Sequence, residues 1–446
     1  MFRPYFGAVS SRARGPKPLP PRVVRPYTRG MTTPVVGIDA LALAVPEAFV
    51  ELTELAGARG VPPAKYVDGL GVRRMAIAQA HEDPVALAAD AGRRVLETAN
   101  VDPAAIGLVV VGTETAVDHS KPIAAYLHGL LGLPRECRIY ETKHACFGGT
   151  AGLLTAHDWI AAGSARGRSA LVVCTDIARY ELGGPGEPTQ GAGAVAMVIT
   201  TDPGLVELDV GISGAASTHV HDFWRPLGQR EAQVDGHYSV QCYLDAVATA
   251  YRGWRTRAVS RGVIDGGGLA SARLARLCYH VPFCKMAKKA HLQVRRCDLD
   301  DAGAAWDKAV EDTHGVASYA AQVEPSLGLC ARVGNVYTGS LYLGLAGLLH
   351  AEAPGLIGQR IGLFSYGSGC TSEFFSGVVA RRAPELIAAA NLPGLLAARE
   401  RISIADYERI MALPPSAPLV PVPGRASDGG FRFVGVTNHQ RQYARS

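Results

Sequence analysis

Residues 138–161 read RIYETKHACFGGTAGLLTAHDWIA. The run Arg138–Thr142 has the composition of a strand, and from Thr150 onward apolar residues recur at helical spacing. Cys146 therefore lies at an expected strand-to-helix junction, followed by two glycines that allow close approach of the backbone. The N-terminal end of a helix and the nearby Lys143 both favour a thiolate, so we expect Cys146 to be a nucleophile. The alternative is a small buried core residue.

Strand-like and helical segments alternate along the rest of the chain. Nearly continuous apolar, β-branched runs, typical of strands buried on both faces, occur at residues 106–112, 170–174, 194–200 and 361–366. Ala- and Leu-rich helical segments occur at residues 84–99, 153–162 and 340–350. This alternation predicts an α/β fold. A turn cluster near residue 203 divides the chain into an expected N-terminal half (34–203) and a C-terminal half (204–446), which finishes with the strand-like run 431–436.

The composition favours a globular protein that stays outside membranes. The chain has 446 residues, of which 48% are hydrophobic, and this is enough for a large core and two domain-sized units. No apolar run approaches the roughly 18 residues that cross a bilayer. The nine cysteines are scattered and form no C-x-x-C pair. We therefore expect a soluble, cytoplasmic protein without a disulfide framework or a zinc site.

The N-terminal residues differ in composition from the rest. Residues 1–30 contain six arginines, one lysine, six prolines and no acidic residue, so this segment is not expected to fold alone. We expect either that residues 1–33 are a disordered basic tail or that Met31 is the initiator. Without residues 1–30 the chain carries 38 basic and 40 acidic residues, so its charge gives no support for a nucleic-acid partner.

A carboxylate follows the first of the expected buried strands. Residues 110–115 read VVGTET, which places Glu114 at the carboxyl end of the strand over residues 106–112. Ligands of open α/β sheets gather beyond that edge of the sheet. Partial desolvation there would raise the pKa of Glu114 and make the side chain a usable acid and base near neutral pH. The alternative is an exposed glutamate in a loop or a helix cap.

A histidine and two lysines stand close together in the C-terminal half, where residues 278–289 read CYHVPFCKMAKK. His280 follows a short apolar run, and Pro282 holds the intervening residue in an extended conformation. Lys285 and Lys289 lie four residues apart on one expected helical face, which suits a phosphate-bearing ligand. The alternatives are a core histidine and a solvated basic face.

Two further segments have features of a ligand site. In VGNVYTGS at 333–340, the amide of Asn335 can bind a thioester carbonyl or simply cap the helix. In FSYGSG at 364–369, the small-residue turn around Ser368 can admit a pantetheine arm or form a tight connection. The other histidines show no metal-ligand spacing, so we expect no metal.

Cys146, Glu114 and His280 come from distant parts of the chain and form a plausible catalytic set. Cysteine proteases also use Cys and His, but their third member is usually an Asn or Asp that orients the imidazole. A glutamate on a buried strand better suits carbanion chemistry on a thioester. Such chemistry holds an acyl group on sulfur, removes an α-proton, stabilises the enolate and attacks a second carbonyl.

These segments identify a family resemblance. From about residue 34 to residue 442 the chain resembles the hydroxymethylglutaryl-CoA synthases of the thiolase superfamily. The matching segments, in the order and spacing of that family, are GTET (112–115), ACFGGT (145–150), GEPTQGAGAVAM (186–197), HDFWRP (221–226), YHVPFCKM (279–286), VGNVYT (333–338) and FSYGSG (364–369).

The resemblance implies a fold and a set of roles. The fold is a thiolase-like, five-layered α-β-α-β-α architecture with two pseudo-equivalent halves, assembled as a homodimer. Cys146 would accept an acetyl group, Glu114 would take a methyl proton and later protonate the tertiary alkoxide, and His280 would hold and polarise a β-ketoacyl thioester. Positions that contact substrate or CoA in this family correspond here to Thr189, Ser239, Lys285, Lys289, Asn335 and Ser368. Water would then hydrolyse the enzyme thioester. The resemblance implies no cofactor, with CoA or phosphopantetheine thioesters serving as substrates.

The resemblance leaves two branches of the family open. Synthases of the mevalonate pathway use free acetyl-CoA and acetoacetyl-CoA, whereas those associated with polyketide synthases take the acyl groups from acyl carrier proteins. The segments DHSKP (118–122), KH (143–144) and DGHYS (235–239) look more like the polyketide-associated branch, which predicts carrier proteins as partners in β-branching. The mevalonate role is the alternative. Two remoter alternatives are a ketoacyl synthase and an inactive scaffold. A ketoacyl synthase would decarboxylate a malonyl donor and would usually show a His and an Asn, or two His, rather than Glu114, and a scaffold should lack one catalytic residue.

Overall fold

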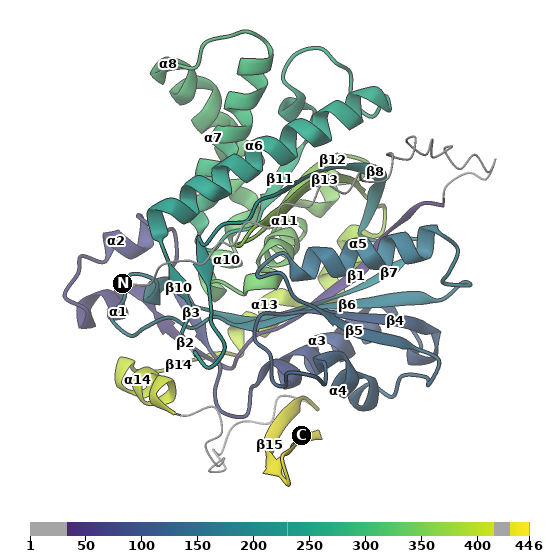
Figure 1. Cartoon of the computed structure of the whole chain (residues 1–446), viewed down its shortest axis with the longest axis vertical. Coiled ribbons are helices and arrows are strands. Elements are labelled where there is room, and N and C mark those ends of the chain that lie inside the picture. The colour runs from purple at the N-terminus through teal and green to yellow at the C-terminus, as the bar shows by residue number, and fades with distance from the viewer. Residues whose placement is uncertain (1–33, 230, 414–428, 446) are drawn as a thin grey trace, which may run out of the picture. The chain divides into compact units, whose positions relative to one another are not determined.

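Nine strands form the central sheet of the protein. In the computed structural model the described residues are 34–229, 231–413 and 429–445, so the expected basic tail lies outside them. The strands hydrogen-bond in the order β11-β12-β13-β8-β1-β7-β6-β4-β5 (Figure 1). Their bounds are β1 Val36–Ala44, β4 Ile106–Gly112, β5 Arg138–Thr142, β6 Ser169–Ile177, β7 Ala192–Thr200, β8 Val206–Ser217, β11 Arg276–Tyr279, β12 Arg360–Gly367 and β13 Thr371–Val379.

Helices cover and separate the two halves of this sheet. Figure 1 shows α6 (Gly236–Ser260) above the strands β8, β12 and β13, and α3 (Pro84–Ala99) and α4 (Ile123–Leu130) below the strands of the first half. Helices α5 (Gly148–Ala161) and α11 (Ser340–Leu356) lie between the two sets of strands, because α5 packs on β4 and β6 while α11 packs on β11 and β12. The layers therefore alternate α-β-α-β-α, as expected from the resemblance.

Hydrogen bonds of one threonine connect the two helices of the middle layer with each other and with β12. The hydroxyl of Thr150 on α5 lies 2.7 Å from the hydroxyl of Tyr342 on α11 and 2.8 Å from that of Ser365 on β12. The two half-sheets join through three antiparallel residue pairs between β1 and β8, among them Val36 with Leu208. This short ladder makes one nine-stranded series out of the two half-sheets.

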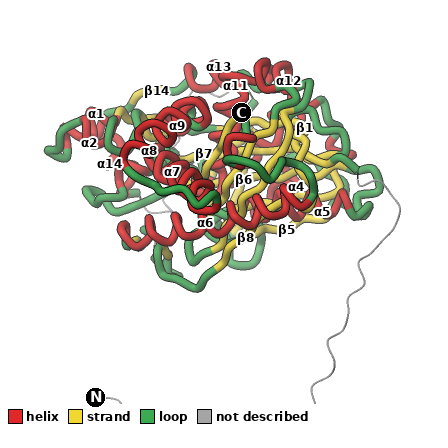
Figure 2. The backbone as a smooth tube through the Cα atoms, turned by 90° about the horizontal axis from the view of Figure 1, so that it is seen from above, coloured by secondary structure: helices red, strands yellow, loops and turns green. Residues whose placement is uncertain are grey.

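The order of the elements repeats between the two halves. In the first half β1, α3, β4, α5, β6 and β7 occur in this order, with other elements between some of them, and in the second half β8, α6, β11, α11, β12 and β13 occur in the same order. Each set places the second strand parallel to its neighbour and the last strand antiparallel. Among its described residues, the second half has no counterpart of β5 in this sheet, and it inserts α7 (Cys284–Asp301), which lies beside α6 (Figure 2).

The hydrophobic pattern explains why the central strands form where they do. Every residue of β4 is buried, and the two faces of β4 belong to different hydrophobic clusters, one shared with α5 and the other with α3. Strands buried on both faces need continuous apolar residues, as the sequence predicted. The strand over residues 106–112 and the helix over residues 84–99 are confirmed at the predicted bounds. The predicted runs 170–174, 194–200, 361–366 and 340–350 fall inside β6, β7, β12 and α11, and the run 153–162 extends one residue beyond the end of α5.

The C-terminal run has a different place from that of the central strands. Strand β15 (Phe431–Thr437) pairs with β16 (Gln440–Arg445) as a separate hairpin that packs against α3. Smaller sheets are β14-β2-β3 (Glu400–Arg401, Ala48–Glu51, Arg74–Ile77) and β10-β9 (Gln233–Val234, Phe223–Trp224). The remaining α-helices are α1 Leu52–Ala58, α2 Ala64–Val67, α8 Lys308–Val310, α9 Ala317–Gln322, α10 Cys330–Val333, α12 Ala383–Ala389, α13 Leu392–Ala397 and α14 Ile404–Ala412. Short 3-10 helices are η1 Pro103–Ala105, η2 Glu187–Thr189, η3 Ala270–Arg273, η5 Glu324–Leu327 and η6 Tyr337–Gly339, and η4 Glu311–Val316 is a short π-helix.

Two predictions concern cross-links and membranes. All nine cysteines are free thiols, so the prediction of a chain without a disulfide framework is confirmed. Among the described residues, no helix combines the length and the apolar composition that a membrane span requires.

Candidate active site

Cys146 lies in a tight turn between β5 and α5, as the sequence predicted. The preceding residue, Ala145, has φ of +41°, a left-handed conformation that is strained for a residue with a side chain. Helix α5 begins two residues after Cys146, with Gly148 and Gly149. A Cβ on Gly149 would lie 2.4 Å from the Sγ of Cys174 and 2.7 Å from the carbonyl oxygen of Thr338. Only a glycine therefore allows α5 to approach the turn before α11 this closely.

Glu114 and Cys146 are in direct contact. The Cys146 thiol donates a hydrogen bond to Oε1 of Glu114 over 2.9 Å. Burial, with a smaller contribution from Asp176, raises the pKa of Glu114 to about 8. The carboxyl group of Glu114 can therefore exchange protons near neutral pH, as its position at the end of β4 predicted.

The predicted thiolate of Cys146 is a point that the structure corrects. Burial and the Glu114 carboxylate raise the pKa of the Cys146 thiol well above its usual range. Lys143 is exposed, so its charge is screened by solvent, while the carboxylate lies in hydrogen-bonding contact. The helix N-terminus is in the predicted place, but desolvation and the neighbouring negative charge outweigh it. Cys146 rests as a thiol that needs a proton acceptor.

Asp176 positions this pair and was missed in the sequence. Its carboxylate accepts hydrogen bonds from the backbone N–H of Glu114 (2.8 Å) and from the hydroxyl of Thr115 (2.8 Å). It also accepts from the backbone N–H of Thr338 (3.1 Å), just before α11. One buried carboxylate thus fixes the turn after β4 against the turn before α11. Asp176 lies in β6, two residues after the predicted strand 170–174, so the rule that identified Glu114 could also have identified Asp176.

His280 follows β11, which is the counterpart of β4 in the second half. Its backbone N–H donates to the carbonyl oxygen of Phe364 (2.7 Å), and its own carbonyl accepts from the hydroxyl of Tyr243 (2.7 Å). The side chain is buried, and burial lowers the pKa of His280 to about 3. The imidazole is therefore neutral at physiological pH and can serve a carbonyl as an uncharged hydrogen-bond donor.

A cavity of about 230 Å³ brings most of the predicted residues together. Six of the nine predicted site residues line it: Cys146, Thr189, Ser239, His280, Asn335 and Ser368. Glu114 reaches the cavity through its hydrogen bond to Cys146. Residues from both halves of the chain therefore surround one space.

The structure does not place the two lysines in the lining of this cavity. Lys285 and Lys289 are both exposed on α7. Lys285 instead lines a second, open cavity of about 610 Å³, together with Arg73 and Arg332. The shared helical face of the two lysines is confirmed, and their contact with a ligand stays a prediction.

The side-chain oxygen of Asn335 bonds within the protein, while its NH₂ group can bind a ligand. Its Oδ1 accepts from the backbone N–H of Tyr337 (2.9 Å) and from the hydroxyl of Ser340 (2.8 Å), which starts α11. Because Oδ1 is engaged in this cap, the Nδ2 group is the part that can donate to a ligand. The two alternatives drawn from the sequence are therefore compatible.

Aromatic side chains that the sequence analysis did not identify form much of the cavity wall. They are Tyr180, Phe223, Phe283, Tyr337, Tyr243 and Tyr366. The buried carboxylate of Asp222 supports this wall. It accepts hydrogen bonds from the hydroxyl of Tyr366 over 2.6 Å and from the backbone N–H of Gly369 over 2.9 Å. The wall could not be found from local pattern, because buried aromatic residues are also ordinary core residues.

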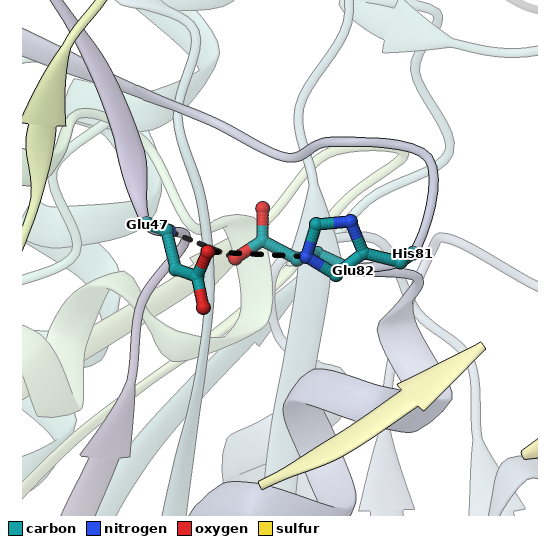
Figure 3. Close-up of side chains that lie close together, drawn as sticks. All are labelled: Glu47, His81 and Glu82. Carbon is teal, nitrogen blue, oxygen red and sulfur yellow. Dashed lines mark hydrogen bonds and ion pairs between the residues drawn. The ribbon is translucent and has the colours of Figure 1, made fainter. Parts of the chain in front are cut away.

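One group of side chains has the composition of a metal site but lies elsewhere. Among the described residues, ligand atoms of Glu47, His81 and Glu82 lie within 4.8 Å of one another (Figure 3). The Glu82 carboxylate accepts the backbone N–H groups of Glu47 (2.8 Å) and Gln79 (2.9 Å). Burial raises the pKa of Glu47 and lowers that of His81, and the positive charge of Arg432 opposes the first shift and adds to the second. These contacts fasten the turn before α3, so we assign no metal to this group.

Comparisons with known proteins agree with this arrangement. The family model described as the N-terminal part of hydroxymethylglutaryl-coenzyme A synthase matches residues 33–204. The model for the C-terminal part matches residues 206–312 and 293–417. The hydroxymethylglutaryl-CoA synthase of Enterococcus faecalis is 38% identical over 377 residues, which cover 84% of this chain and 91% of that protein.

Two similar solved structures differ in what they bind, a CoA thioester in one and a carrier protein in the other. One is MvaS in complex with 3-hydroxy-3-methylglutaryl coenzyme A, which is 55% identical and superposes with a TM-score of 0.90 over 93% of this chain and 100% of that chain. The other is the HMG synthase of the curacin biosynthetic pathway in complex with its holo donor acyl carrier protein. It is 31% identical, with a TM-score of 0.83 over 92% of this chain and 100% of that chain.

Proposed function

The chain belongs to the hydroxymethylglutaryl-CoA synthase family, and on this basis we propose that it joins an acetyl group held on Cys146 to a β-ketoacyl thioester. The product is a thioester of the 3-hydroxy-3-methylglutaryl type. The enzyme is an acyltransferase of the condensing kind. The observation that carries the proposed roles is the 2.9 Å contact between the Cys146 thiol and the Glu114 carboxylate.

The first step transfers the acetyl group to the enzyme. The sulfur of Cys146 attacks the carbonyl carbon of the acetyl thioester, and the donor thiol leaves with a proton. Because burial and Glu114 raise the pKa of Cys146, the thiol must lose its proton as it attacks, and Oε1 of Glu114 is placed to accept it. Glu114 then passes this proton to the leaving donor thiolate and is again a base for the second step.

The second step forms the carbon–carbon bond. Glu114 removes a proton from the methyl group of acetyl-Cys146, and the resulting enolate attacks the β-keto carbon of the acceptor. The β-oxygen becomes an alkoxide and takes the proton back from Glu114. A pKa of about 8 lets one carboxyl group act as base and then as acid. Water finally hydrolyses the bond to Cys146.

The remaining predicted residues hold the acceptor. The neutral imidazole of His280 and the Nδ2 group of Asn335 donate to its carbonyl oxygens without adding a charge. Ser239, Ser368 and Thr189 line the path of the pantetheine arm. Every proton transfer in this scheme uses a protein side chain, so we propose that thioester substrates are sufficient and no cofactor is needed.

Mass spectrometry and product analysis test this proposal together. Incubation with acetyl-CoA should add one acetyl group to the intact protein, and subsequent acetoacetyl-CoA should remove it with formation of 3-hydroxy-3-methylglutaryl-CoA. Cys146→Ala should carry no adduct, whereas the control Cys297→Ala, at a buried cysteine of α7, should be acetylated normally. An adduct that survives Cys146→Ala would place the nucleophile elsewhere.

The identity of the natural donor is the finer part of the proposal. The 55% identical relative holds a CoA thioester, whereas the carrier-protein complex comes from a relative that is 31% identical. This difference favours free acetyl-CoA and acetoacetyl-CoA, the mevalonate-type role, over the carrier-protein role that the short sequence segments suggested. Polyketide β-branching on carrier proteins is the second candidate.

A comparison of donors separates these two roles. If CoA thioesters are the substrates, Cys146 should be acetylated by acetyl-CoA at least as fast as by an acetyl carrier protein, at low and at high salt. If a carrier protein is the donor, contacts between the two proteins should make acetylation of Cys146 by the acetyl carrier protein much faster than by acetyl-CoA. Salt should weaken that advantage, because exposed charges are screened within about 8–10 Å.

A further inference from the structure

Tyr337 holds a buried hydroxyl group that the protein itself does not satisfy. The residue is 1% exposed, and among the described residues its oxygen has no hydrogen-bond partner. The hydroxyl of Tyr180 lies near enough to influence the pKa of Tyr337, but not in hydrogen-bonding geometry. A buried hydroxyl without a partner is costly, so its presence in a native structure requires an explanation.

The backbone of Tyr337 is also held in an unfavourable conformation. Its φ is +39°, in the left-handed region that residues with a side chain rarely adopt. The N–H of Tyr337 donates to Oδ1 of Asn335, and the next residue, Thr338, is fixed by Asp176. These contacts fix the turn and keep the ring packed against the rings of Tyr180 and Phe223 (centroids 6.5 and 5.9 Å away). Strain of this kind persists where the surrounding structure enforces it, often at functional sites.

The ring of Tyr337 forms part of the wall of the active-site cavity. Cys146 and His280 line the same cavity. Both Glu114 and Cys146 act electrostatically on Tyr337 and, with burial as the main cause, keep its pKa well above the usual range. The phenol therefore stays protonated and is a hydrogen-bond donor close to these two groups.

We propose that the Tyr337 hydroxyl donates a hydrogen bond to the β-oxygen of the bound acceptor thioester, the oxygen that becomes the alkoxide. This inference rests on the proposed function. In that scheme the alkoxide forms beside Cys146, which carries the attacking carbon, and within reach of Glu114, which returns the proton. A neutral donor at this place stabilises the developing negative charge, and it gains its missing partner only when the acceptor is bound. No atom is transferred from Tyr337.

The variant Tyr337→Phe tests the first part of this inference through stability. Phenylalanine keeps the ring and removes only the unsatisfied oxygen, so the melting temperature should stay equal or rise. The matched control is Tyr342→Phe, because Tyr342 is equally buried but its hydroxyl has a partner in Thr150. Its melting temperature should fall. An equal fall in both variants would show that the Tyr337 hydroxyl serves the fold, and would overturn the proposal.

Ligand selectivity tests the second part. On a Cys146→Ala background, which prevents acyl transfer, acetoacetyl-CoA and butyryl-CoA differ at the β-carbon by the presence of the oxygen. Calorimetry should show a preference for acetoacetyl-CoA that falls roughly five- to tenfold when Tyr337→Phe is added. A preference unchanged by Tyr337→Phe would overturn the proposal while leaving the proposed function intact. Failure of the Cys146→Ala protein to bind either thioester would instead refute the proposed function, and with it the ligand assigned to Tyr337.

Discussion

Cys146 and Glu114 behave as one acid–base unit. The Glu114 carboxylate raises the pKa of the Cys146 thiol, whereas the hydrogen bond from that thiol lowers the pKa of Glu114 against the larger effect of burial. Apparent pKa values measured for such a pair belong to the pair and not to one residue. The chemistry of the site therefore depends on how the protein holds these two side chains together.

Glu114→Gln should separate acetylation from condensation. The amide cannot accept the methyl proton, so condensation should fall roughly a thousandfold or more. Removal of the carboxylate also removes a charge that opposes ionisation of Cys146, which compensates in part for the lost proton acceptor. Acetyl-enzyme should thus still form, as seen by mass spectrometry of the intact protein. Retention of most of the condensation rate would remove Glu114 from the mechanism.

The pH dependence of condensation should follow Glu114. Its pKa is raised to about 8, so the fraction in the basic form, and with it the rate, should increase through about pH 8, where half of the groups are ionised, and level off above about pH 9. His280, with a pKa lowered to about 3, does not titrate in this range and should add no second limb. Single-turnover rates of the acetyl-enzyme, measured across pH, provide the test. A flat profile between about pH 6 and about pH 9 would contradict the assignment.

Turns at the ends of strands and helices carry the site. Sequence reasoning identified Cys146, Glu114 and His280 because each directly follows an apolar run or precedes a glycine turn. It could not identify Asp222 or the aromatic wall, because their roles arise from long-range packing between β9, α6 and β12. It also misjudged the ionisation of Cys146, because desolvation depends on the surrounding fold and not on neighbours in the sequence.

Asp83 connects helix α3 to the C-terminal hairpin. Its Oδ1 caps the helix by accepting from the N–H of Ala86 (2.8 Å), and its Oδ2 accepts from Arg441 (2.6 Å) and from the hydroxyl of Tyr443 (2.7 Å). Asp83→Ala should destabilise the protein by about 2 kcal/mol, whereas Asp83→Asn, which can keep the cap, should cost about half of that.

Denaturant unfolding and hydrogen exchange distinguish the two contributions of Asp83. Amides of residues 431–445 should exchange faster in both variants, because both lose the Arg441 ion pair. Asp102→Ala is the control, since Asp102 caps only the short helix η1 and is not bonded to the hairpin. Unchanged exchange in the hairpin of Asp83→Ala would show that other contacts hold it.

Helix α7 presents Lys285 and Lys289 to solvent outside the cavity. If these lysines bind the phosphates of CoA, the double change Lys285→Gln/Lys289→Gln should raise KM for acetyl-CoA several-fold with little effect on kcat. Lys288 is the control on the same helix, because its ammonium group lies over the ring of Tyr319 instead (5.9 Å). Equal effects of Lys288→Gln and the double change would indicate a general loss of charge and not a binding site.

The two halves of the chain meet at the active site, and neither half contains it alone. The first half supplies Cys146 and Glu114, and the second supplies His280 and Asn335 from equivalent places in the repeated order of elements. The sequence predicted the α/β class and the residues on each side of the boundary. The short β1–β8 ladder was not predicted, because pairing between distant edge strands leaves no local pattern.

The edge strand β5 of the nine-stranded sheet can pair with a second copy of the chain, so it bears on the oligomeric state. Strand β5 ends the sheet, and in the part of the chain that the structure describes it pairs with β4 alone. Edge strands with unpaired backbone groups readily pair with another chain. We propose a homodimer, so light scattering after size exclusion should give about twice the mass of 46.9 kDa calculated from the sequence. A single-chain mass at micromolar concentration would refute the dimer.

The joint between the halves also bears on how the polypeptide could be divided. Between β7 and β8 the chain runs through Thr201 and Asp202, both exposed, while contacts such as those of Thr150 and Asp176 cross from one half to the other inside the protein. The peptide bond at this place contributes connectivity but no catalytic group. Two separately synthesised fragments that meet there would hold complementary halves of a single reaction centre, so activity restored on mixing would report their association.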